Sequence, residues 1–188
     1  QGSSYKVDTL YHAKVGPGTT QTSLALSGAL KLRVFYTTTD LTDPNVDIRV
    51  AKAKNKILAT ANVPSMAKTN TKEKKLYFAG VNADFFDMFA ERSPYMPAGI
   101  CIKDGQVLCN PHSMCTFFGM DRVGNPVISS FAENPELKGQ LLCALGGREI
   151  MLRDGEIAEV SPCEAFSFTC HPRTCVGIRE DGTTIILV

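Results

Sequence analysis

A proline-led arginine near the C-terminus is the most informative chemical group in this chain. Arg173 follows His171 and Pro172 and precedes Thr174. Proline fixes its own φ and pushes the residue before it into extended geometry. Because the backbone before Arg173 is restricted in this way, the guanidinium can present its planar set of N–H donors in a defined direction. Such a group suits bidentate contact with a phosphate or a carboxylate. His171 and Thr174 add donors beside it. The alternative is a surface arginine paired with a nearby acid.

Asn82 and Asp84 are the second candidate pair, and they lie two residues apart. Residues with this spacing share one face of a strand, so an amide and a carboxylate would point toward one site. An aspartate there can act as a general acid or base, or hold a sugar hydroxyl, while the asparagine orients the substrate. The alternative is local: Asp84 caps the following turn and Asn82 satisfies nearby backbone groups.

Other motifs with known chemistry are incomplete or missing. Gly146-Gly147 lacks the Lys-Ser/Thr that completes a phosphate-binding loop. The sequence contains neither Gly-x-Ser-x-Gly nor His-Glu-x-x-His. The aspartates of its Asp-Gly pairs are best interpreted as turn formers, and not as paired catalytic carboxylates. We therefore expect neither a metal nor a cofactor.

The chain has seven cysteines and no CxxC pair, which argues against a zinc ribbon or a thioredoxin-type motif. The cysteines near His171 do not have a common zinc-site spacing either. Cys143 and Cys175 lie in apolar, strand-like sequence, where a small buried residue fits. A disulfide among Cys101, Cys109 and Cys115 stays open, since spacing alone does not fix pairing.

Composition restricts the class of protein. A chain of 188 residues with 44% hydrophobic content suits one domain with a sizeable core. Its 20 basic and 19 acidic residues give a net charge of +1, which offers no support for binding nucleic acid or an anionic membrane. No apolar run approaches the roughly 18 residues of a membrane span. The chain opens Gln-Gly-Ser-Ser without Met, which fits the removal of an export signal or of a tag. We expect a secreted or extracytoplasmic protein, with which this start is compatible.

Alternating apolar and polar residues predict two strands, at 30–36 and 46–50, paired antiparallel across a turn-rich connection. A third strand at 75–81 would deliver Asn82 and Asp84 at its end. The polar stretch between the second and third strands is weakly patterned and is expected to be a long loop or partly helical.

Three Asp-Gly pairs occur further along the chain, at 104–105, 154–155 and 181–182. Asp-Gly supplies the positive φ angles of tight turns, so each pair predicts a β-hairpin, with a looser one around 120–125. Short helices are predicted at 84–91, with Asp84 as N-cap, and at 132–138, which a proline limits. The apolar end at 185–188 should be paired inside a sheet. The expected class is α+β and β-rich, with antiparallel hairpins in twisted sheets and few short helices.

An ordered set of these motifs resembles the phosphodiester glycosidase family. In chain order the motifs are the Asn-x-x-Phe-Phe-like element at 82–86, a hairpin at 99–105, a second hairpin at 145–155, and the His-Pro-Arg-Thr strand at 171–182. The resemblance covers roughly residues 76–188, and residues 1–75 would be variable N-terminal strands and a loop. The family pattern continues beyond Val188, so the resemblance implies a single, truncated domain.

The resemblance implies a hydrolase that cuts sugar 1-phosphodiesters between the anomeric carbon and the phosphate oxygen, with activity impaired by truncation. Its ligand would be a carbohydrate 1-phosphodiester, either a small molecule or a glycan. Asp84 and Arg173 would be catalytic, and Asn82, His171 and Thr174 would bind substrate. One alternative is a non-catalytic carbohydrate- or surface-binding module on the same hairpins. Another is a structural β-domain in which Arg173 forms an ion pair.

Overall fold

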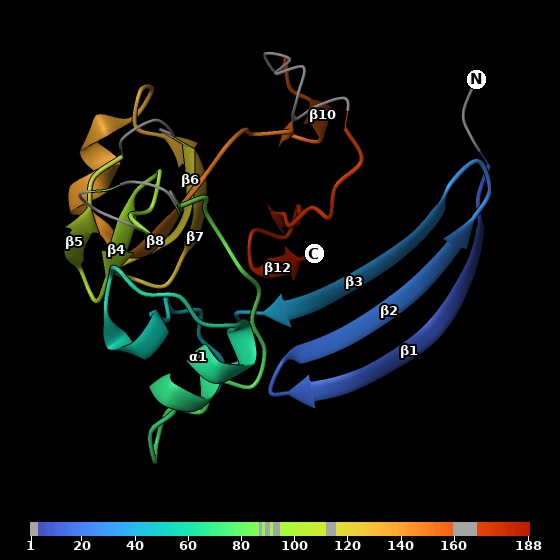
Figure 1. Cartoon of the computed structure of the whole chain (residues 1–188), viewed down its shortest axis with the longest axis horizontal. Coiled ribbons are helices and arrows are strands. Elements are labelled where there is room, and N and C mark those ends of the chain that lie inside the picture. Colours follow the sequence, from blue (N-terminus) through green and yellow to red (C-terminus); the bar gives the residue numbers. More distant parts are fainter. Residues whose placement is uncertain (1–3, 87, 89–90, 92–94, 112–115, 160–168) are drawn as a thin grey trace.

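The chain folds into two five-stranded antiparallel sheets and a separate two-stranded hairpin (Figure 1). The computed structural model describes residues 4–86, 88, 91, 95–111, 116–159 and 169–188. Short helices accompany the strands in those residues: η1 (Ala53–Asn55), α1 (Val63–Asn70) and η2 (Pro135–Gly139). This arrangement confirms the predicted β-rich α+β class with antiparallel hairpins.

The first sheet is built mainly from the N-terminal part of the chain. Its strands, in spatial order, are β1 (Lys6–Gly16), β2 (Thr19–Ser27), β3 (Lys31–Asp40), β12 (Thr184–Leu187) and β11 (Val176–Ile178). Figure 1 shows β1, β2 and β3 as long, curved strands. The register of β1 shifts around Leu10 and Val15, and such bulges bend a strand. Threonine favours extended backbone, which explains why the Thr-rich β2 forms a strand without a long apolar run.

Two predicted strands are confirmed in this sheet. The strand at 30–36 falls almost entirely within β3, and the apolar end at 185–188 overlaps β12, which lies between β3 and β11. Ile185 is fully buried and lies opposite Thr39. On the other side of β3, the hydroxyl groups of Thr19 and Thr39 are 3.3 Å apart in the interior. The C-terminal strand is therefore part of the core.

The second sheet holds the hairpins predicted from turn chemistry. Its spatial order is β5 (Gln106–Cys109), β4 (Cys101–Lys103), β8 (Leu141–Gly147), β6 (Thr116–Asp121) and β7 (Pro126–Ser130). The separate hairpin consists of β9 (Leu152–Arg153) and β10 (Glu156–Ile157). Asp-Gly turns join β4 to β5, β9 to β10 and β11 to β12, and the looser turn joins β6 to β7, as predicted.

The Asp-Gly turns use their aspartates locally. Asp104 has a φ of 52° and is followed by Gly105 at 76°, in the left-handed region that tight hairpin turns require. The carboxylate of Asp181 accepts backbone hydrogen bonds from Thr184 and the residue before it, and these bonds lower the pKa of Asp181 to about 2. These side chains are therefore engaged in forming turns.

The second sheet is buried on both faces. One cluster contains Ile100, Ile102, Phe117, Leu141 and Ala144, and the other contains Val50, Cys101, Met120 and Cys143. Alternation along β4 places successive residues on opposite faces, as a strand requires. Cys143 is buried, as predicted, whereas Cys175 is half-buried.

The predicted strand at 46–50 is wrong, although its pattern of burial is right. The segment is irregular, and β3 pairs with β2 and β12 instead. Its apolar residues Ile48 and Val50 nevertheless pack on the second sheet. Side chains of that sheet take the place of a strand partner: Lys103 Nζ donates to Val50 O at 2.8 Å, and Cys143 Sγ to Ile48 O at 3.5 Å.

The segment at 75–81 is also not a strand. The backbone N–H of Tyr77 donates to Thr71 Oγ1 at 3.1 Å, so a side chain at the end of α1 occupies a group that a strand partner would use. The ring of Phe78 lies where a Cβ on Gly16 would be, next to the turn between β1 and β2. The segment is therefore held by contacts with the end of α1 and with the turn between β1 and β2.

Both predicted helices need correction. Asp84 has a φ of 60°, which is incompatible with the extended geometry of an N-cap, and Phe86 bridges to Pro97 in a β-type pair. The remainder of 84–91 lies partly outside the described residues. The predicted helix at 132–138 is a 3-10 helix, η2, that begins at Pro135.

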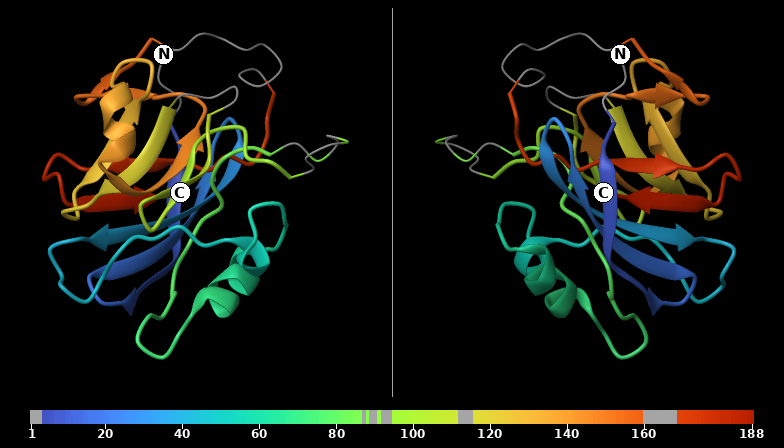
Figure 2. Two further views of the ribbon diagram at one scale, coloured as in Figure 1. Left: turned by 90° about the vertical axis from the view of Figure 1, so that its left-hand side faces the viewer. Right: turned by 90° about the vertical axis from the view of Figure 1, so that its right-hand side faces the viewer.

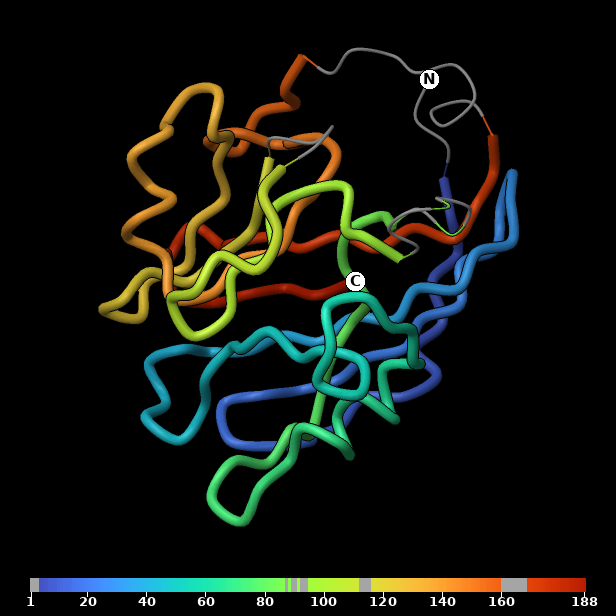
Figure 3. Tube along the Cα trace, turned by 60° about the vertical axis from the view of Figure 1, so that its left-hand side comes forward, coloured from blue at the N-terminus to red at the C-terminus, as the bar shows by residue number. Residues whose placement is uncertain are grey.

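The C-terminal strands join the two sheets in space. In Figures 2 and 3 the red C-terminal segment runs between the blue N-terminal strands and the yellow and orange strands of the second sheet. Direct contact between β11 and β7 agrees with this placement. Among the described residues, none of the helices has the length and apolar character needed to cross a membrane.

Candidate functional site

The structure brings together two of the predicted site residues from distant parts of the sequence. Thr174 Oγ1 donates to Asn82 Oδ1 at 2.9 Å, across 92 residues of sequence. Both side chains are exposed. Thr174 lies in the segment that leads into β11, and Asn82 lies in the segment that leaves α1 and enters the second sheet. The hydrogen bond therefore joins the two segments that carry all five predicted site residues.

Asp84 is held by backbone groups at the edge of this site. Its Oδ1 accepts from the N–H of Phe85 at 2.6 Å, and its Oδ2 accepts from the N–H of Gly99 at 3.0 Å. Burial raises the pKa of Asp84 above its ordinary value of 3.8, and the two backbone hydrogen bonds partly oppose that rise. Each oxygen keeps a second lone pair, so the carboxylate can still accept a proton or a hydroxyl hydrogen.

A short backbone pairing fixes the position of Asp84. Phe86 and Pro97 form an antiparallel bridge, and the N–H of Ala98 donates to Phe85 O at 2.8 Å. This pairing places the start of β4 beside the Asp84 carboxylate. Asp84 has a left-handed φ, and its side chain accepts a hydrogen bond from Gly99 just before that strand. A non-glycine residue keeps this backbone conformation only where the surrounding contacts hold it there.

Two glycines pack directly against the Asp84 carboxylate. A Cβ on Gly99 would come within 2.7 Å of the Gly146 Cα and 3.3 Å of Asp84 Oδ2. A Cβ on Gly146 would come within 2.7 Å of the Gly99 Cα and 3.0 Å of the same oxygen. Both glycines are buried. We call this arrangement of Asp84, Gly99 and Gly146 the two-glycine cradle.

The glycines at 99 and 146 are a sequence signal for the two-glycine cradle, and the motifs described above do not include it. Gly146 was considered only as part of a phosphate-binding loop, and Gly99 only as the start of a hairpin motif. Glycine at a strand end also indicates a close approach of another backbone. That interpretation fits here, because Gly99 lies just before β4, Gly146 lies on the neighbouring strand β8, and a Cβ on either glycine would meet the other's Cα.

Arg173 lies in the same exposed segment as His171 and Thr174. Its Nη2 donates to Thr169 O at 3.0 Å, which anchors one arm of the guanidinium within its own loop. The next residue, Thr174, makes the hydrogen bond to Asn82. Arg173 is therefore adjacent in sequence to the contact between the two segments. The convergence of Asp84 and Arg173 on one ligand stays a prediction.

Two thiols share the neighbourhood of Asp84. Burial raises the pKa of Cys101 to about 11, and the nearby Cys109 and Asp84 add to that rise. Burial, with a contribution from Asp84, also raises the pKa of Cys109. Within the described part of the chain, no three His, Cys, Asp or Glu side chains are placed to hold a metal ion together.

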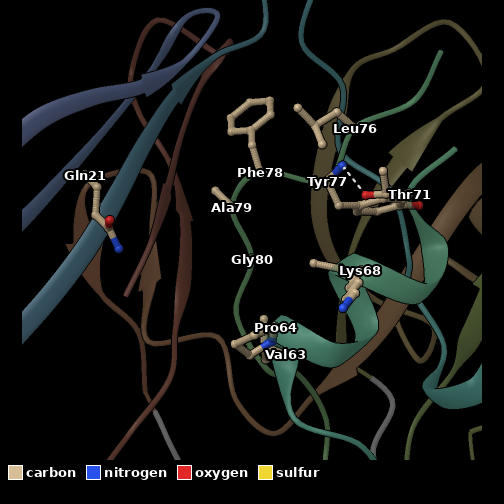
Figure 4. Close-up of a pocket in the computed structure, with 11 residues that line it drawn as sticks. Gln21, Val63, Pro64, Lys68, Thr71, Leu76, Tyr77, Phe78, Ala79 and Gly80 are labelled. Carbon is tan, nitrogen blue, oxygen red and sulfur yellow. Dashed lines mark hydrogen bonds between the residues drawn. The ribbon is translucent and has the colours of Figure 1, made fainter. Parts of the chain in front are cut away.

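A separate hollow of about 560 Å³ lies between α1, β2 and the segment before Asn82 (Figure 4). Its lining residues are Gln21, Val63, Pro64, Ala67, Lys68, Thr71, Leu76, Tyr77, Phe78, Ala79 and Gly80. None of the five predicted site residues belongs to this lining. Lys68 is its one charged member, so the hollow offers little that would recognise a phosphodiester.

Comparison with protein families assigns the chain to a family. The model of the phosphodiester glycosidase family matches residues 77–188, more than half of the chain, and that range includes Asn82, Asp84 and Arg173. The chain therefore belongs to the phosphodiester glycosidase family. A search of the curated proteins gave no match. At the level of the family, the function is phosphodiester glycosidase-like and the substrate class is a sugar phosphodiester.

The bond between Asn82 and Thr174 leads to a testable prediction. Replacing Thr174 with Val removes the hydroxyl and keeps the shape, so the variant should lose the stabilisation of one exposed hydrogen bond, about 0.5–1 kcal/mol. A double-mutant cycle with Asn82→Ala, measured by urea unfolding, should give a coupling energy of that size. Additive effects of the two substitutions would show that the bond does not hold the segments together.

Proposed function

We propose that the protein hydrolyses sugar 1-phosphodiesters at the site formed by the Asn82 and Thr174 segments. Water would add to the anomeric carbon while the bond from that carbon to the phosphate oxygen breaks, giving a free sugar and a phosphomonoester. The observation that supports this most strongly is the hydrogen bond between Asn82 and Thr174, since it joins the two motif segments beside the held carboxylate of Asp84.

We assign the phosphate to Arg173. The phosphomonoester that departs is a good leaving group, so its departure requires stabilisation of negative charge more than protonation by a strong acid. The planar fork of the guanidinium matches the geometry of the phosphate oxygens, and Arg173 lies next to Thr174, which bonds to Asn82. His171 and Thr174 flank this group and would contact the same substrate.

We assign the sugar and the attacking water to Asn82 and Asp84. The ionised Asp84 carboxylate would orient the water, accept its proton and stabilise the positive charge that develops at the anomeric carbon. Asn82 would orient a sugar hydroxyl through its amide. The two-glycine cradle would keep the Asp84 carboxylate in a fixed direction while this occurs, which is the preorganisation that such a mechanism needs.

A carbohydrate-binding module is the second candidate, because the same polar groups would also hold a sugar phosphate without cleaving it. The two are distinguished by incubating the protein with a methyl phosphodiester of a sugar and following both binding and release of the free sugar. Enzyme function predicts sugar release that Asp84→Ala abolishes. Binding without release of the free sugar would support the module.

The pH dependence of hydrolysis should report the ionisation of Asp84. The mechanism needs the carboxylate ionised, and burial raises its pKa above 3.8. Activity should therefore be low in acid and rise with pH through the raised pKa of Asp84, so the midpoint of kcat/KM should lie above 3.8. Asp84→Glu should move this midpoint, because it changes the burial of the carboxyl group. A flat profile from pH 3 to 7 would remove Asp84 from the role of base.

A further inference from the structure

Cys101 and Cys109 lie opposite each other on neighbouring strands. They are Cα partners in the antiparallel pair of β4 and β5, beside a register shift between Cys101 and Ile102, and both thiols are free. Directly opposed residues in a regular antiparallel pair have Cβ atoms about 4.5–5.5 Å apart, and the irregular ladder here leaves the backbone room to adjust. A disulfide needs Cα atoms about 4.4–6.8 Å apart and Cβ atoms close to 4 Å apart. The backbone therefore brings the two cysteines to within a small adjustment of bonding geometry.

The two side chains also share a face of the sheet. Cys101 is 2% exposed and belongs to the cluster of Val50, Met120 and Cys143, and Cys109 packs against that cluster. Cys143 is in the cluster too, but its strand partner is Met120. Among these three described cysteines, only Cys101 and Cys109 are Cα partners of each other.

Cys109 is the accessible member of the pair. It lies on β5, which is an edge strand of the second sheet, and it is half-buried. Its Sγ contacts Asn110 O at 3.3 Å, Met96 Sδ at 3.5 Å and Pro97 O at 3.6 Å. These contacts are weak, so rotation about the Cα–Cβ bond of Cys109 can turn its sulfur toward Cys101 at small cost.

We propose that Cys101 and Cys109 are a disulfide-forming pair that closes in the presence of a small disulfide oxidant such as glutathione disulfide. The thiolate of Cys109 attacks the oxidant, forms a mixed disulfide and releases one glutathione thiolate. The thiolate of Cys101 then attacks the Cys109 sulfur and releases the second glutathione. Two protein thiols are oxidised, one glutathione disulfide is reduced to two glutathiones, and the two thiol protons pass to solvent or to the departing thiolates.

Protonation makes this closure slow at neutral pH. Exchange requires a thiolate, and burial raises the pKa of both thiols, that of Cys101 to about 11. Raising the pH increases the thiolate fraction, so closure should be faster at pH 9 than at pH 7. The pair is therefore suited to a lasting cross-link in an oxidising compartment, and less suited to a rapid redox sensor.

The cross-link would form next to the backbone segment that holds the Asp84 carboxylate. Cys109 Sγ contacts Pro97 O, Pro97 bridges to Phe86, and Gly99 donates to Asp84 two residues before Cys101. A covalent bond between β4 and β5 would thus tie the edge strand to the strand that holds the carboxylate. The proposal itself does not depend on the glycosidase activity, and its test measures only the thiols.

The test is oxidation of the full chain with glutathione disulfide at pH 9, followed by denaturation, alkylation and mass spectrometry. Trypsin cuts after Lys103, which separates Cys101 from Cys109. We expect two fewer alkylated cysteines and a cross-linked pair of peptides, one ending at Lys103 and the other spanning 104–122. Dithiothreitol should release both peptides, and the linked species should accumulate several-fold more slowly at pH 7.

Single cysteine variants show which two cysteines form the disulfide. Cys109→Ser and Cys101→Ala should each abolish the cross-link, whereas Cys143→Ala should retain it, because that cysteine faces Met120. Cys115 shares the 104–122 peptide with Cys109 and lies outside the described residues, so Cys115→Ser should also retain the link. The proposal is overturned if Cys101 and Cys109 both stay alkylatable after oxidation, or if the link survives Cys109→Ser.

Discussion

Replacing Arg173 with Lys should lower kcat/KM for a sugar 1-phosphodiester by roughly 30- to 1000-fold, equivalent to about 2–4 kcal/mol of transition-state stabilisation. Lysine keeps the positive charge and loses the planar fork, so it cannot reproduce bidentate contact with the departing phosphate. A lysine keeps the charge and can still donate to Thr169 O, which accepts from Arg173 Nη2 in the structure. We expect the substitution to affect the reaction more than the fold, and urea unfolding of the variant checks the fold.

Arg153→Lys is the matched control. Arg153 is also exposed and donates to Glu133 through the same Nη2 atom, at 3.1 Å, but it lies on β9 outside the proposed site. That variant should keep kcat/KM within about twofold of the wild type, since exposed ion pairs contribute little. Equal and small effects of both substitutions would show that Arg173 has a structural role.

The hairpins of this fold were predictable because their signals are local. Asp-Gly at 104–105 sets the φ angles of its own turn whatever the rest of the chain does. The segment at 46–50 shows the limit of local signals. Alternation there correctly indicated which side faces the core, but burial does not specify a strand partner. The contacts of Lys103 and Cys143 with that backbone take the place of a ladder, and no local pattern encodes them.

The proximity of two candidate residues was predictable from the family motifs. Their order led us to expect Asn82 and Thr174 close together, and the structure joins them by a hydrogen bond, while their role in a site stays a prediction. The conformation of Asp84 was missed. An Asp at a chain reversal suggests a helix cap, whereas its left-handed φ and its bond to Gly99 depend on a residue 15 positions away. Long-range contacts of this kind determine what the carboxylate can do.

Gly146→Ala should destabilise the second sheet and disturb the Asp84 carboxylate. The new Cβ would lie 2.7 Å from the Gly99 Cα and 3.0 Å from Asp84 Oδ2. A backbone atom cannot swing aside as a flexible side chain can, so either the strands separate or the carboxylate moves. Overpacking of this kind costs about 1–3 kcal/mol, and we expect that loss in urea unfolding together with a fall in kcat/KM.

Gly147→Ala is the matched control for this effect. It adds the same methyl group one position along β8, where the nearest atom is Thr116 Oγ1 at 3.5 Å, an ordinary contact. The two variants share strand, residue type and change in composition, so their difference isolates the two-glycine cradle. If Gly146→Ala displaces the carboxylate toward solvent, the pKa of Asp84 measured by NMR should fall toward 3.8, because burial is what raises it. Wild-type stability and an unchanged Asp84 pKa in Gly146→Ala would show that the cradle does not position this carboxylate.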